Sequence, residues 1–348
     1  MSEKMNVVAI VDERKAEVRE VTRPKPLKNQ VLIKIDGCAL CTFEQRMFTR
    51  VAKVPLPFVG GHEFTGTIVE LGEGVKAEEY PLGQRVAARL LHSCGHCYGC
   101  RHDEQNVCDH SSDVDMSQMD IMGMGGLAEY INADISQVYF LNNDLPVEKA
   151  CFAEPLACVL NSIERGHLEI GEDVVVIGGG IMGQLHVMCA KLSGCRVIMS
   201  EPDGPRRELA KKLGADICID PTQVDAVEEV KRLTDGEGAA AVFNTTAVSA
   251  VAQQAIGMVA KLGTVVMYSS QHPDKPIEVS PGWLHNSEAN ITGAVSPSIR
   301  SFRRSVNALS KGIIDPELLV SGVFDYHDCQ KAFETAIRPD TFRCIIKF

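Results

Sequence analysis

The sequence predicts an α/β protein that combines a β-rich domain with a doubly wound, six-stranded parallel sheet. Up to about residue 150, short alternating runs such as "QVLIKI", "GTIVEL" and "QRVAARL" are separated by Gly and Pro, which is typical of strands joined by turns. Beyond that point, apolar runs such as "DVVVI" and "CRVIMS" alternate with helical segments. This alternation is typical of parallel strands joined by right-handed crossovers.

The expected domain boundaries follow from where the pattern changes. The parallel-sheet domain is expected at residues 155–293, inserted in a β-rich domain formed by residues 1–154 and 294–348. The final segment holds a polar helix around "SIRSFRRSVNALSKG" and a strand "FRCIIKF", which are too short to bury a core of their own. Within the inserted domain, "SAVAQQAIGMVAKLG" predicts one helix over residues 249–263, followed by the strand "TVVMYSS".

Composition excludes several classes of protein. Of the 348 residues 45% are hydrophobic, which is enough to bury a large core without disulfide bonds, and the 13 cysteines are an odd number. The N-terminus lacks the apolar segment of a secretion signal, so a reduced, cytoplasmic protein is expected. The net charge of −11 argues against a nucleic-acid partner. No apolar run approaches the roughly 20 residues of a membrane helix.

A glycine-rich turn indicates a dinucleotide site. The segment "GGGIMG" at residues 178–183 fits the pattern G-x-G-x-x-G, follows the strand "DVVVI" and opens a helix. The glycines would allow a tight turn, a close approach of phosphate and packing of the helix against the strand. Backbone N–H groups at the start of the helix could then hold a pyrophosphate. A glycine turn without a ligand is the alternative. The expected cofactor contacts here are Gly178, Gly180, Ile181, Met182 and Gly183.

A carboxylate favours NAD over NADP. Glu201 ends the strand "CRVIMS", where it can accept hydrogen bonds from the adenosine ribose hydroxyls and repel a 2′-phosphate. Arg206 and Arg207 lie nearby and either meet a 2′-phosphate or face solvent. We include Arg206, Thr245 and Thr246 among the expected cofactor contacts.

Four cysteines fall within one short loop, at residues 91–110. They are Cys94, Cys97, Cys100 and Cys108, in the spacing C-x2-C-x2-C-x7-C. Four thiolates complete the tetrahedral shell of zinc and leave no position for water or substrate, so the spacing predicts a structural zinc. An iron–sulfur cluster and metal-free buried cysteines are the alternatives. The nearby His92, His96 and His102 are expected to be exposed loop residues.

A second metal site with an open position needs ligands elsewhere in the chain. The candidates are Cys41, the adjacent pair His62 and Glu63, and Glu154. Glycines around His62 allow tight turns there. Taken singly, a Cys or His is more often a core residue than a ligand.

The run from Gly61 to Val75 resembles the signature of the zinc-containing medium-chain alcohol dehydrogenases, G-H-E-x2-G-x5-G-x2-V, with every fixed position filled. "GGLAEY", the four-cysteine loop, "EPLAC" and the glycine turn occur in the order that this family shows. The chain is most similar to the branch of sorbitol and other polyol, galactitol-phosphate and threonine dehydrogenases. The resemblance implies a GroES-like fold for the β-rich domain and a Rossmann fold for the other.

The resemblance also implies two Zn²⁺ ions per chain, one catalytic and one structural. Cys41 and His62 become ligands of the catalytic zinc, Glu63 a ligand or its close partner, and Glu154 a direct or water-mediated ligand. A Cys41 thiolate and a Glu63 carboxylate already neutralise the dication. Glu154 is therefore expected to move between zinc and water.

The segment after Cys41 departs from the family. Members usually carry Ser or Thr two positions after this cysteine, as the start of a proton relay, and the polyol branch then has Asp. Phe43 and Glu44 occupy those positions here. The alternatives for carrying the proton are zinc-bound water with Glu154 or Glu63, and a displaced Thr42.

Arg46 is a candidate substrate-binding residue. It stands where threonine-dehydrogenase-like members often place His. Its guanidinium is expected either to bind an anionic group of the substrate or to form a structural salt bridge with Glu44 or another acid.

The predicted function is reversible, zinc-dependent, NAD-linked oxidation of a secondary alcohol to a ketone. The expected substrate is a polyol, sugar, sugar phosphate or sugar acid. A threonine-type amino alcohol is the alternative substrate, and a non-catalytic, nucleotide-binding redox sensor is the alternative from another class. By resemblance, a homodimer or homotetramer is expected, with contacts near "TVVMYSS" or "NITGAV".

Overall fold

The computed structural model describes residues 3–111, 113, 119–271 and 273–348. The chain forms two compact units, Met1–Ala157 with Pro297–Phe348, and Cys158–Ser296. Each of the two boundaries between these units lies three residues beyond the domain boundary expected from the sequence. In the described part of the chain, no helix has the length and apolar character to cross a bilayer.

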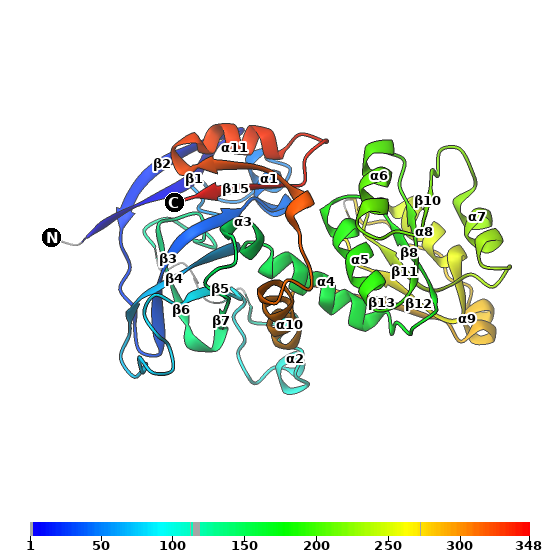
Figure 1. Ribbon diagram of the computed structural model, residues 1–348, viewed down its shortest axis with the longest axis horizontal. Helices are drawn as coiled ribbons and strands as arrows, with labels where there is room; N and C mark the ends of the chain where they lie inside the picture. The colour runs from blue at the N-terminus through cyan, green and yellow to red at the C-terminus, as the bar shows by residue number, and fades with distance from the viewer. Residues whose placement is uncertain (1–2, 112, 114–118, 272) are drawn as a thin grey trace. The chain divides into compact units, whose positions relative to one another are not determined.

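A seven-stranded sheet carries the first unit. Its strands follow the order β14-β15-β3-β4-β5-β7, and β6 pairs with β3. The C-terminal strand β15 lies antiparallel to β3, so the last segment of the chain completes this sheet (Figure 1). The bounds are β3 (Gln30–Ala39), β4 (Glu63–Leu71), β5 (Arg85–Ala88), β6 (Tyr130–Asp134), β7 (Val138–Phe140), β14 (Val320–Asp325) and β15 (Arg343–Lys347).

A hairpin and short helices surround this sheet. Strands β1 (Lys4–Asp12) and β2 (Lys15–Thr22) pair with each other, and bridges such as Val7 to Ala128 connect the hairpin to the body. Phe333 of α11 stacks on Phe48 of α1, with ring centroids 4.8 Å apart. The helices are α1 (Thr42–Phe48), α2 (Tyr98–Arg101), α3 (Val147–Ala150), α10 (Ile299–Ser310) and α11 (Cys329–Ala336), with 3₁₀ turns at Gln105–Val107, Ile135–Gln137, Glu317–Leu319 and Tyr326–Asp328.

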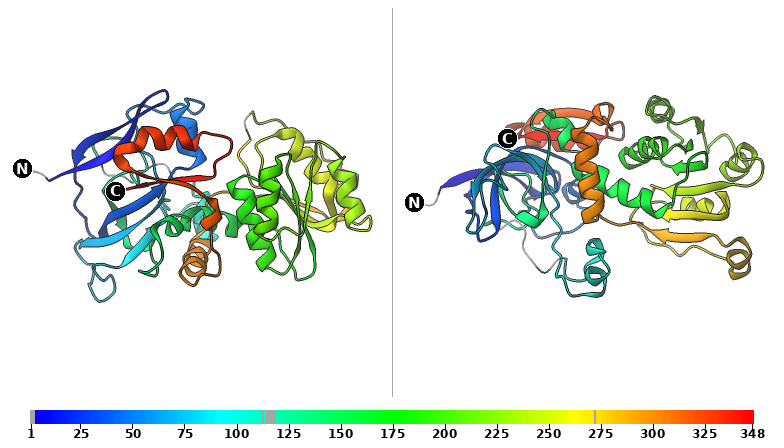
Figure 2. Two further views of the ribbon diagram at one scale, coloured as in Figure 1. Left: turned by 45° about the horizontal axis from the view of Figure 1, so that its top comes forward. Right: turned by 60° about the horizontal axis from the view of Figure 1, so that its bottom comes forward.

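The second unit is a parallel sheet of six strands in the order β10-β9-β8-β11-β12-β13. Helix α5 packs with α6, and α7 packs with α8, so helices cover both faces of the sheet (Figures 1 and 2). This strand order is that of a Rossmann fold, and the predicted fold class is confirmed. The strands are β8 (Asp173–Ile177), β9 (Arg196–Ser200), β10 (Ile217–Ile219), β11 (Ala239–Asn244), β12 (Val259–Met267) and β13 (Asn290–Gly293).

The predicted helix over 249–263 is five residues too long. The helices of this region are α4 (Ala153–Arg165), which begins in the first unit, α5 (Ile181–Leu192), α6 (Gly204–Lys212), α7 (Ala226–Leu233), α8 (Ser249–Met258) and α9 (Pro281–Ser287). Helix α8 ends at Met258 because Val259 already pairs with Ala239 of β11. Pairing with a buried neighbouring strand outweighs the local helix propensity of "VAKL".

Candidate active site

Two strand ends bring Cys41, His62 and Glu63 together in the first unit. Ala39, the last residue of β3, pairs with Glu63, the first residue of β4. Cys41 therefore follows β3 and caps α1 beside His62, which immediately precedes β4. One ligand atom from each of these three side chains lies within 4.8 Å of the others. A thiol, an imidazole and a carboxylate at this spacing could hold one metal ion.

The buried Glu44 fixes the orientation of His62. One Glu44 carboxylate oxygen accepts the Gly61 backbone N–H at 2.9 Å and lies 3.2 Å from His62 Nδ1. The other accepts the Cys41 backbone N–H at 3.1 Å. Burial raises the pKa of Glu44, but His62 and the backbone N–H groups of Gly61 and of Glu44 itself together outweigh burial and lower the pKa below its usual value, so Glu44 is a carboxylate. With Nδ1 donating to Glu44, Nε2 is the nitrogen that offers its lone pair to a metal.

A buried arginine holds Glu63. Arg343 donates from Nε and Nη2 to the two Glu63 oxygens at 2.7 and 2.6 Å, and both side chains are buried. The antiparallel register of β15 on β3 places Arg343 opposite Cys41, and its Nη2 lies 3.8 Å from Cys41 Sγ. Burial lowers the pKa of Arg343, but the negative charges of Glu63 and Cys41 outweigh burial and raise the pKa above its usual value. The guanidinium therefore stays charged. Arg343 thus cancels the Glu63 charge that the sequence analysis assigns to neutralising the metal.

Glu154 lies near this group but outside it. It is half-buried in the first turn of α4, and its charge adds to those that raise the pKa of Arg343. Among the described residues, the ligand atoms that lie within 4.8 Å of one another at this site come only from Cys41, His62 and Glu63.

The remaining side chains of α1 have different settings. Phe43 is 41% exposed and sets its ring edge against His62, with centroids 5.9 Å apart. Thr42 is exposed. Of the two alternatives for Arg46, the salt bridge does not form with Glu44, because His62 and backbone N–H groups occupy the Glu44 carboxylate. Arg46 is half-buried and forms no ion pair with any residue that the structure describes.

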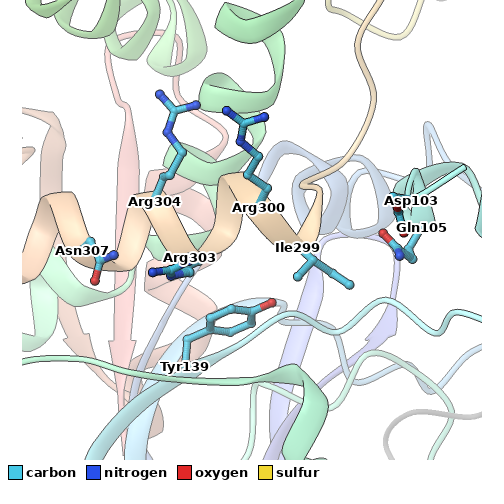
Figure 3. Close-up of a pocket in the computed structure, with 8 residues that line it drawn as sticks. All are labelled: Asp103, Gln105, Tyr139, Ile299, Arg300, Arg303, Arg304 and Asn307. Carbon is cyan, nitrogen blue, oxygen red and sulfur yellow. The ribbon is translucent and has the colours of Figure 1, made fainter.

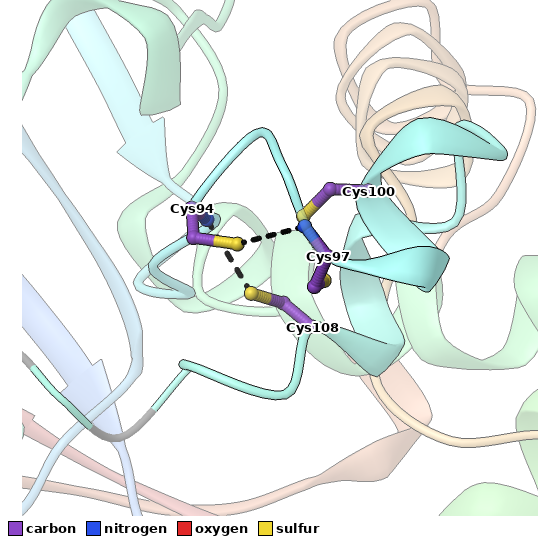
Figure 4. A group of neighbouring side chains, drawn as sticks. All are labelled: Cys94, Cys97, Cys100 and Cys108. Carbon is purple, nitrogen blue, oxygen red and sulfur yellow. Dashed lines mark hydrogen bonds between the residues drawn. The ribbon is translucent and has the colours of Figure 1, made fainter.

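The four cysteines of the loop converge on one point (Figure 4). Their sulfur atoms lie within 4.8 Å of one another, with Cys94 half-buried and the other three buried. The Cys94 and Cys97 backbone N–H groups donate to the sulfurs of Cys108 and Cys94, each at 3.3 Å. Backbone N–H groups lower the pKa of Cys97 to about 6, whereas burial raises the pKa of Cys100 to about 12. Four convergent sulfurs fit a closed zinc shell, in which the metal would stabilise all four thiolates.

The histidines of this loop lie outside the sulfur cluster. His96 and His102 are exposed, as expected, whereas His92 is half-buried. His96 and His110 come within 4.8 Å of Cys94, forming a second, more exposed group that shares this cysteine. Since Cys94 cannot serve both groups at once, the shell of four thiolates is the better fit for a structural zinc.

The glycine turn between β8 and α5 is shaped for a close ligand. Gly178 has φ +99°, and a Cβ on Gly183 would lie 1.8 Å from the Gly178 carbonyl oxygen, so neither position accepts another residue without strain. A Cβ on Gly180, which caps α5, would meet no described atom within 4 Å. The open space over a helix N-terminus suits a pyrophosphate.

Comparison with known proteins assigns the family. Residues 27–143 match the alcohol dehydrogenase GroES-like domain, and residues 182–311 match the zinc-binding dehydrogenase domain. The L-threonine 3-dehydrogenase of Pyrococcus abyssi is 36% identical over 249 residues, 68% of each chain, and the sorbitol dehydrogenase of Halalkalibacterium halodurans is 30% identical over 319 residues, 91% of each chain. The chain belongs to the zinc-containing medium-chain alcohol dehydrogenases. It is therefore a zinc-dependent alcohol or polyol dehydrogenase.

Other relatives are more distant but cover the chain more fully. The D-arabitol-phosphate dehydrogenase of Enterococcus avium is 26% identical and covers 94% of this chain and 92% of its own. Among solved structures, a zinc-binding dehydrogenase from Sinorhizobium meliloti 1021 bound to NADP has a TM-score of 0.89 at 24% identity, over 100% of both chains. A dehydrogenase from E. coli CFT073 in complex with NADH has a TM-score of 0.87 at 24% identity, also over 100% of both chains. These two structures support the fold.

In this dehydrogenase a buried carboxylate stands behind the glycine turn. Glu201 accepts hydrogen bonds from the backbone N–H groups of Gly179 and Asp203. Arg207 donates to the Glu201 carbonyl at 2.6 Å and pairs with Asp220 at 3.0 Å, so it does not simply face solvent. The Cβ of Arg206 would lie 3.2 Å from a Cβ on Gly179, which places Arg206 beside the turn.

The hydroxyl groups of Thr245 and Thr246 form hydrogen bonds with other residues of the protein. Thr245 Oγ1 donates to the carbonyls of Ile177 and Gly178 at 2.8 and 3.1 Å, and Thr246 Oγ1 donates to Asn244 at 2.9 Å. Thr245 thus holds the glycine turn in place. Sequence reasoning missed Gln184, whose buried amide donates to Gly179 O and Arg206 O at 3.0 Å each, because a helical Gln carries no signal of such a role.

Proposed function

We propose that this dehydrogenase oxidises a secondary alcohol to a ketone, reversibly and with NAD, and that its substrate is a polyol, sugar, sugar phosphate or sugar acid. The observation that carries the proposal is the position of His62, which Glu44 holds at Nδ1 and which offers a ligand atom within 4.8 Å of those of Cys41 and Glu63. The names of the sorbitol and D-arabitol-phosphate dehydrogenase relatives support this class of substrate. The threonine dehydrogenase relatives support an amino alcohol as the second candidate.

We propose two zinc sites, one open and one closed. Cys94, Cys97, Cys100 and Cys108 would hold the structural zinc, since their four thiolates leave no open position. Cys41 and His62 would be the fixed ligands of the catalytic zinc. When bound, zinc supplies a Lewis acid for the substrate hydroxyl and NAD supplies the hydride acceptor.

We propose Glu154 as the third ligand of the catalytic zinc, on the basis of the charge balance. Both Glu63 oxygens already bind Arg343, so Glu63 would have to break two buried, charge-assisted hydrogen bonds to reach a metal directly. A dication with one thiolate and one carboxylate is neutral, and since Arg343 cancels Glu63, Glu154 can supply that carboxylate. Glu154→Gln should therefore weaken catalytic zinc more than Glu63→Gln. Equal zinc affinity in wild type and Glu154→Gln would contradict this assignment.

The first unit also shapes what reaches the site. The Phe43 ring covers one side of His62 with apolar surface, and it offers no hydroxyl to accept a proton from the substrate. Thr42 is exposed next to it. Phe43 replaces the hydroxyl that usually starts the proton relay. A Glu154 carboxylate that alternates between metal and water would carry the substrate proton to solvent instead.

Glu201 makes NAD the preferred cofactor in this proposal. Its buried carboxylate lies where the adenosine ribose is expected and would repel a 2′-phosphate. The nearby Arg207 is already paired with Asp220. Glu201→Ser should raise kcat/KM for NADP relative to NAD by about tenfold, the value of one such interaction of about 1.4 kcal/mol. A wild-type preference for NADP would contradict the assignment.

The experiment that tests the proposed function is the appearance of NADH across a panel of polyols, sugar phosphates, hydroxy acids and threonine. Turnover on a secondary alcohol is expected, and no turnover on any of them by protein with two zinc ions would refute the proposal. Arg46→Ala should lower kcat/KM about tenfold more on anionic than on neutral substrates, because a half-buried guanidinium can bind carboxylate or phosphate. Equal losses on both would remove Arg46 from substrate recognition.

A further inference from the structure

Arg89 is a buried cation that forms no ion pair with a carboxylate in the described part of the chain. It follows β5 directly, at the start of the segment that leads into the four-cysteine loop, and only 2% of it is exposed. Its Nη1 has no hydrogen-bond partner among the residues that the structure describes. A buried, unpaired charge costs several kcal/mol, so Arg89 requires a counter-charge.

The strand neighbours of Arg89 do not supply that charge. Its backbone N–H donates to Gln137 O at 2.9 Å, which continues the register that pairs Ala87 with Tyr139. Side chains two apart on a strand share a face, so Arg89 lies on the face of Gln137 and Tyr139. Gln137 offers only a neutral amide, and Tyr139, which also lines a pocket of about 710 Å³ beneath α10 (Figure 3), offers only a phenol.

The cysteine loop, whose first cysteine follows Arg89 by five residues, also supplies groups that interact electrostatically with its charge. Burial lowers the pKa of Arg89, and the groups that oppose this effect are Tyr139, Cys100 and Cys108. Cys100 and Cys108 are 7% and 5% exposed, so solvent screens this interaction weakly. Zinc with four thiolates carries a net charge of −2, because every ligand is an anion and no neutral imidazole replaces a thiolate.

We propose that Arg89 is the counter-ion of the structural zinc centre and that the two buried charges stabilise each other. This inference rests on the structural zinc proposed above. The guanidinium reduces the net charge of the centre from −2 to −1, and the centre in turn supplies the negative charge that the Arg89 surroundings lack. Arg89 thus sets how firmly the loop keeps its zinc, without contacting substrate.

The first test measures the loss of zinc to a chromogenic chelator from full-length, zinc-loaded protein. The phase that belongs to the loop is the one that Cys100→Ser lacks. Arg89→Met should speed this phase at least about tenfold, and Arg89→Lys, which keeps the charge, should restore most of the wild-type rate. Arg101→Met is the matched control, because Arg101 lies in the same loop but is exposed, and it should leave the rate within about twofold.

The second test compares the shift in unfolding midpoint caused by Arg89→Met with and without zinc. The shift should change sign, which a loss of packing alone would not produce. Arg89→Met should lower the unfolding midpoint of the zinc-loaded protein but raise that of protein stripped of zinc, since the cation then has no counter-charge. Equal destabilisation with and without zinc, or a lysine variant no better than methionine, would overturn the proposal. If the Cys100→Ser variant keeps as much zinc as wild type, the structural zinc itself fails, and this inference with it.

Discussion

The described part of the chain offers two candidate zinc sites, the four-cysteine cluster of the loop and the cluster around Cys41, and they differ in what accompanies the sulfur. In the loop, Cys94, Cys97, Cys100 and Cys108 supply four sulfurs within 4.8 Å, stabilised by backbone N–H groups. At the end of β3, the lone Cys41 is joined by an imidazole and is surrounded by ionised side chains. The loop cluster is complete in itself, whereas the Cys41 site depends on residues from distant parts of the chain.

In the proposed function, this difference separates a structural from a reactive site. A full thiolate shell leaves no position for substrate. The Cys41 site has fewer ligands, and Glu44 and Arg343 hold His62 and Glu63 in place around it. The number of cysteines in a cluster is therefore a poor guide to reactivity, and the number of positions left open is the better one.

The largest expected effect is that of Cys41→Ser. Losing a catalytic zinc ligand should reduce kcat/KM by about 10³-fold or more, since the metal contributes several kcal/mol to the transition state. The unfolding midpoint should change little, because the other core contacts remain. Steady-state kinetics and thermal unfolding on the same preparation check both parts. A variant that keeps a tenth of wild-type turnover would break the contrast between the two clusters.

Cys100→Ser should show the opposite pattern. Opening the closed shell is expected to lower the free energy of unfolding by about 3 kcal/mol, as for other losses of a structural metal. For a unit of this size, that corresponds to a midpoint lower by about 10 °C. Below the temperature at which the variant unfolds, its turnover per folded molecule should stay close to that of wild type. If Cys100→Ser instead spares stability and stops catalysis, the roles of the two clusters are reversed.

Glu44→Gln sharpens the comparison at the open site. It keeps the size of the side chain but removes the charge that holds His62 Nδ1, so the affinity for catalytic zinc should fall about 10- to 100-fold. Competition with a metal chelator measures the change. Gln45→Ala, one position further on the same helix, is the control and should leave zinc affinity unchanged. No loss of affinity in Glu44→Gln would mean that the carboxylate does not support the ligand.

The local parts of this account could be predicted from the sequence. The cysteine spacing, the "GGHE" run and the glycine turn each lie within a few residues, and their chemistry depends mainly on that spacing. The structure shows why "GGHE" and "GGLAEY" occur together, since the backbone N–H of Gly126 donates to Gly61 O at 3.0 Å.

The parts that needed the structure depend on contacts between distant residues. Arg343 lies 280 residues from Glu63, and only the pairing of β15 with β3 brings the two together. Arg89 belongs to no motif, and only the structure shows that it is buried with an Nη1 that lacks a partner among the described residues. The end of α8 at Met258 is likewise set by pairing with β11 rather than by the local sequence.

The central claim is that one cluster holds a catalytic zinc and the other a structural zinc. It is tested most directly by the zinc content per chain, measured by elemental analysis of wild type, Cys41→Ser and Cys100→Ser. The account predicts two zinc ions in wild type and one in each variant, with Cys41→Ser still folded and inactive. One zinc in wild type, or two in Cys41→Ser, would contradict it.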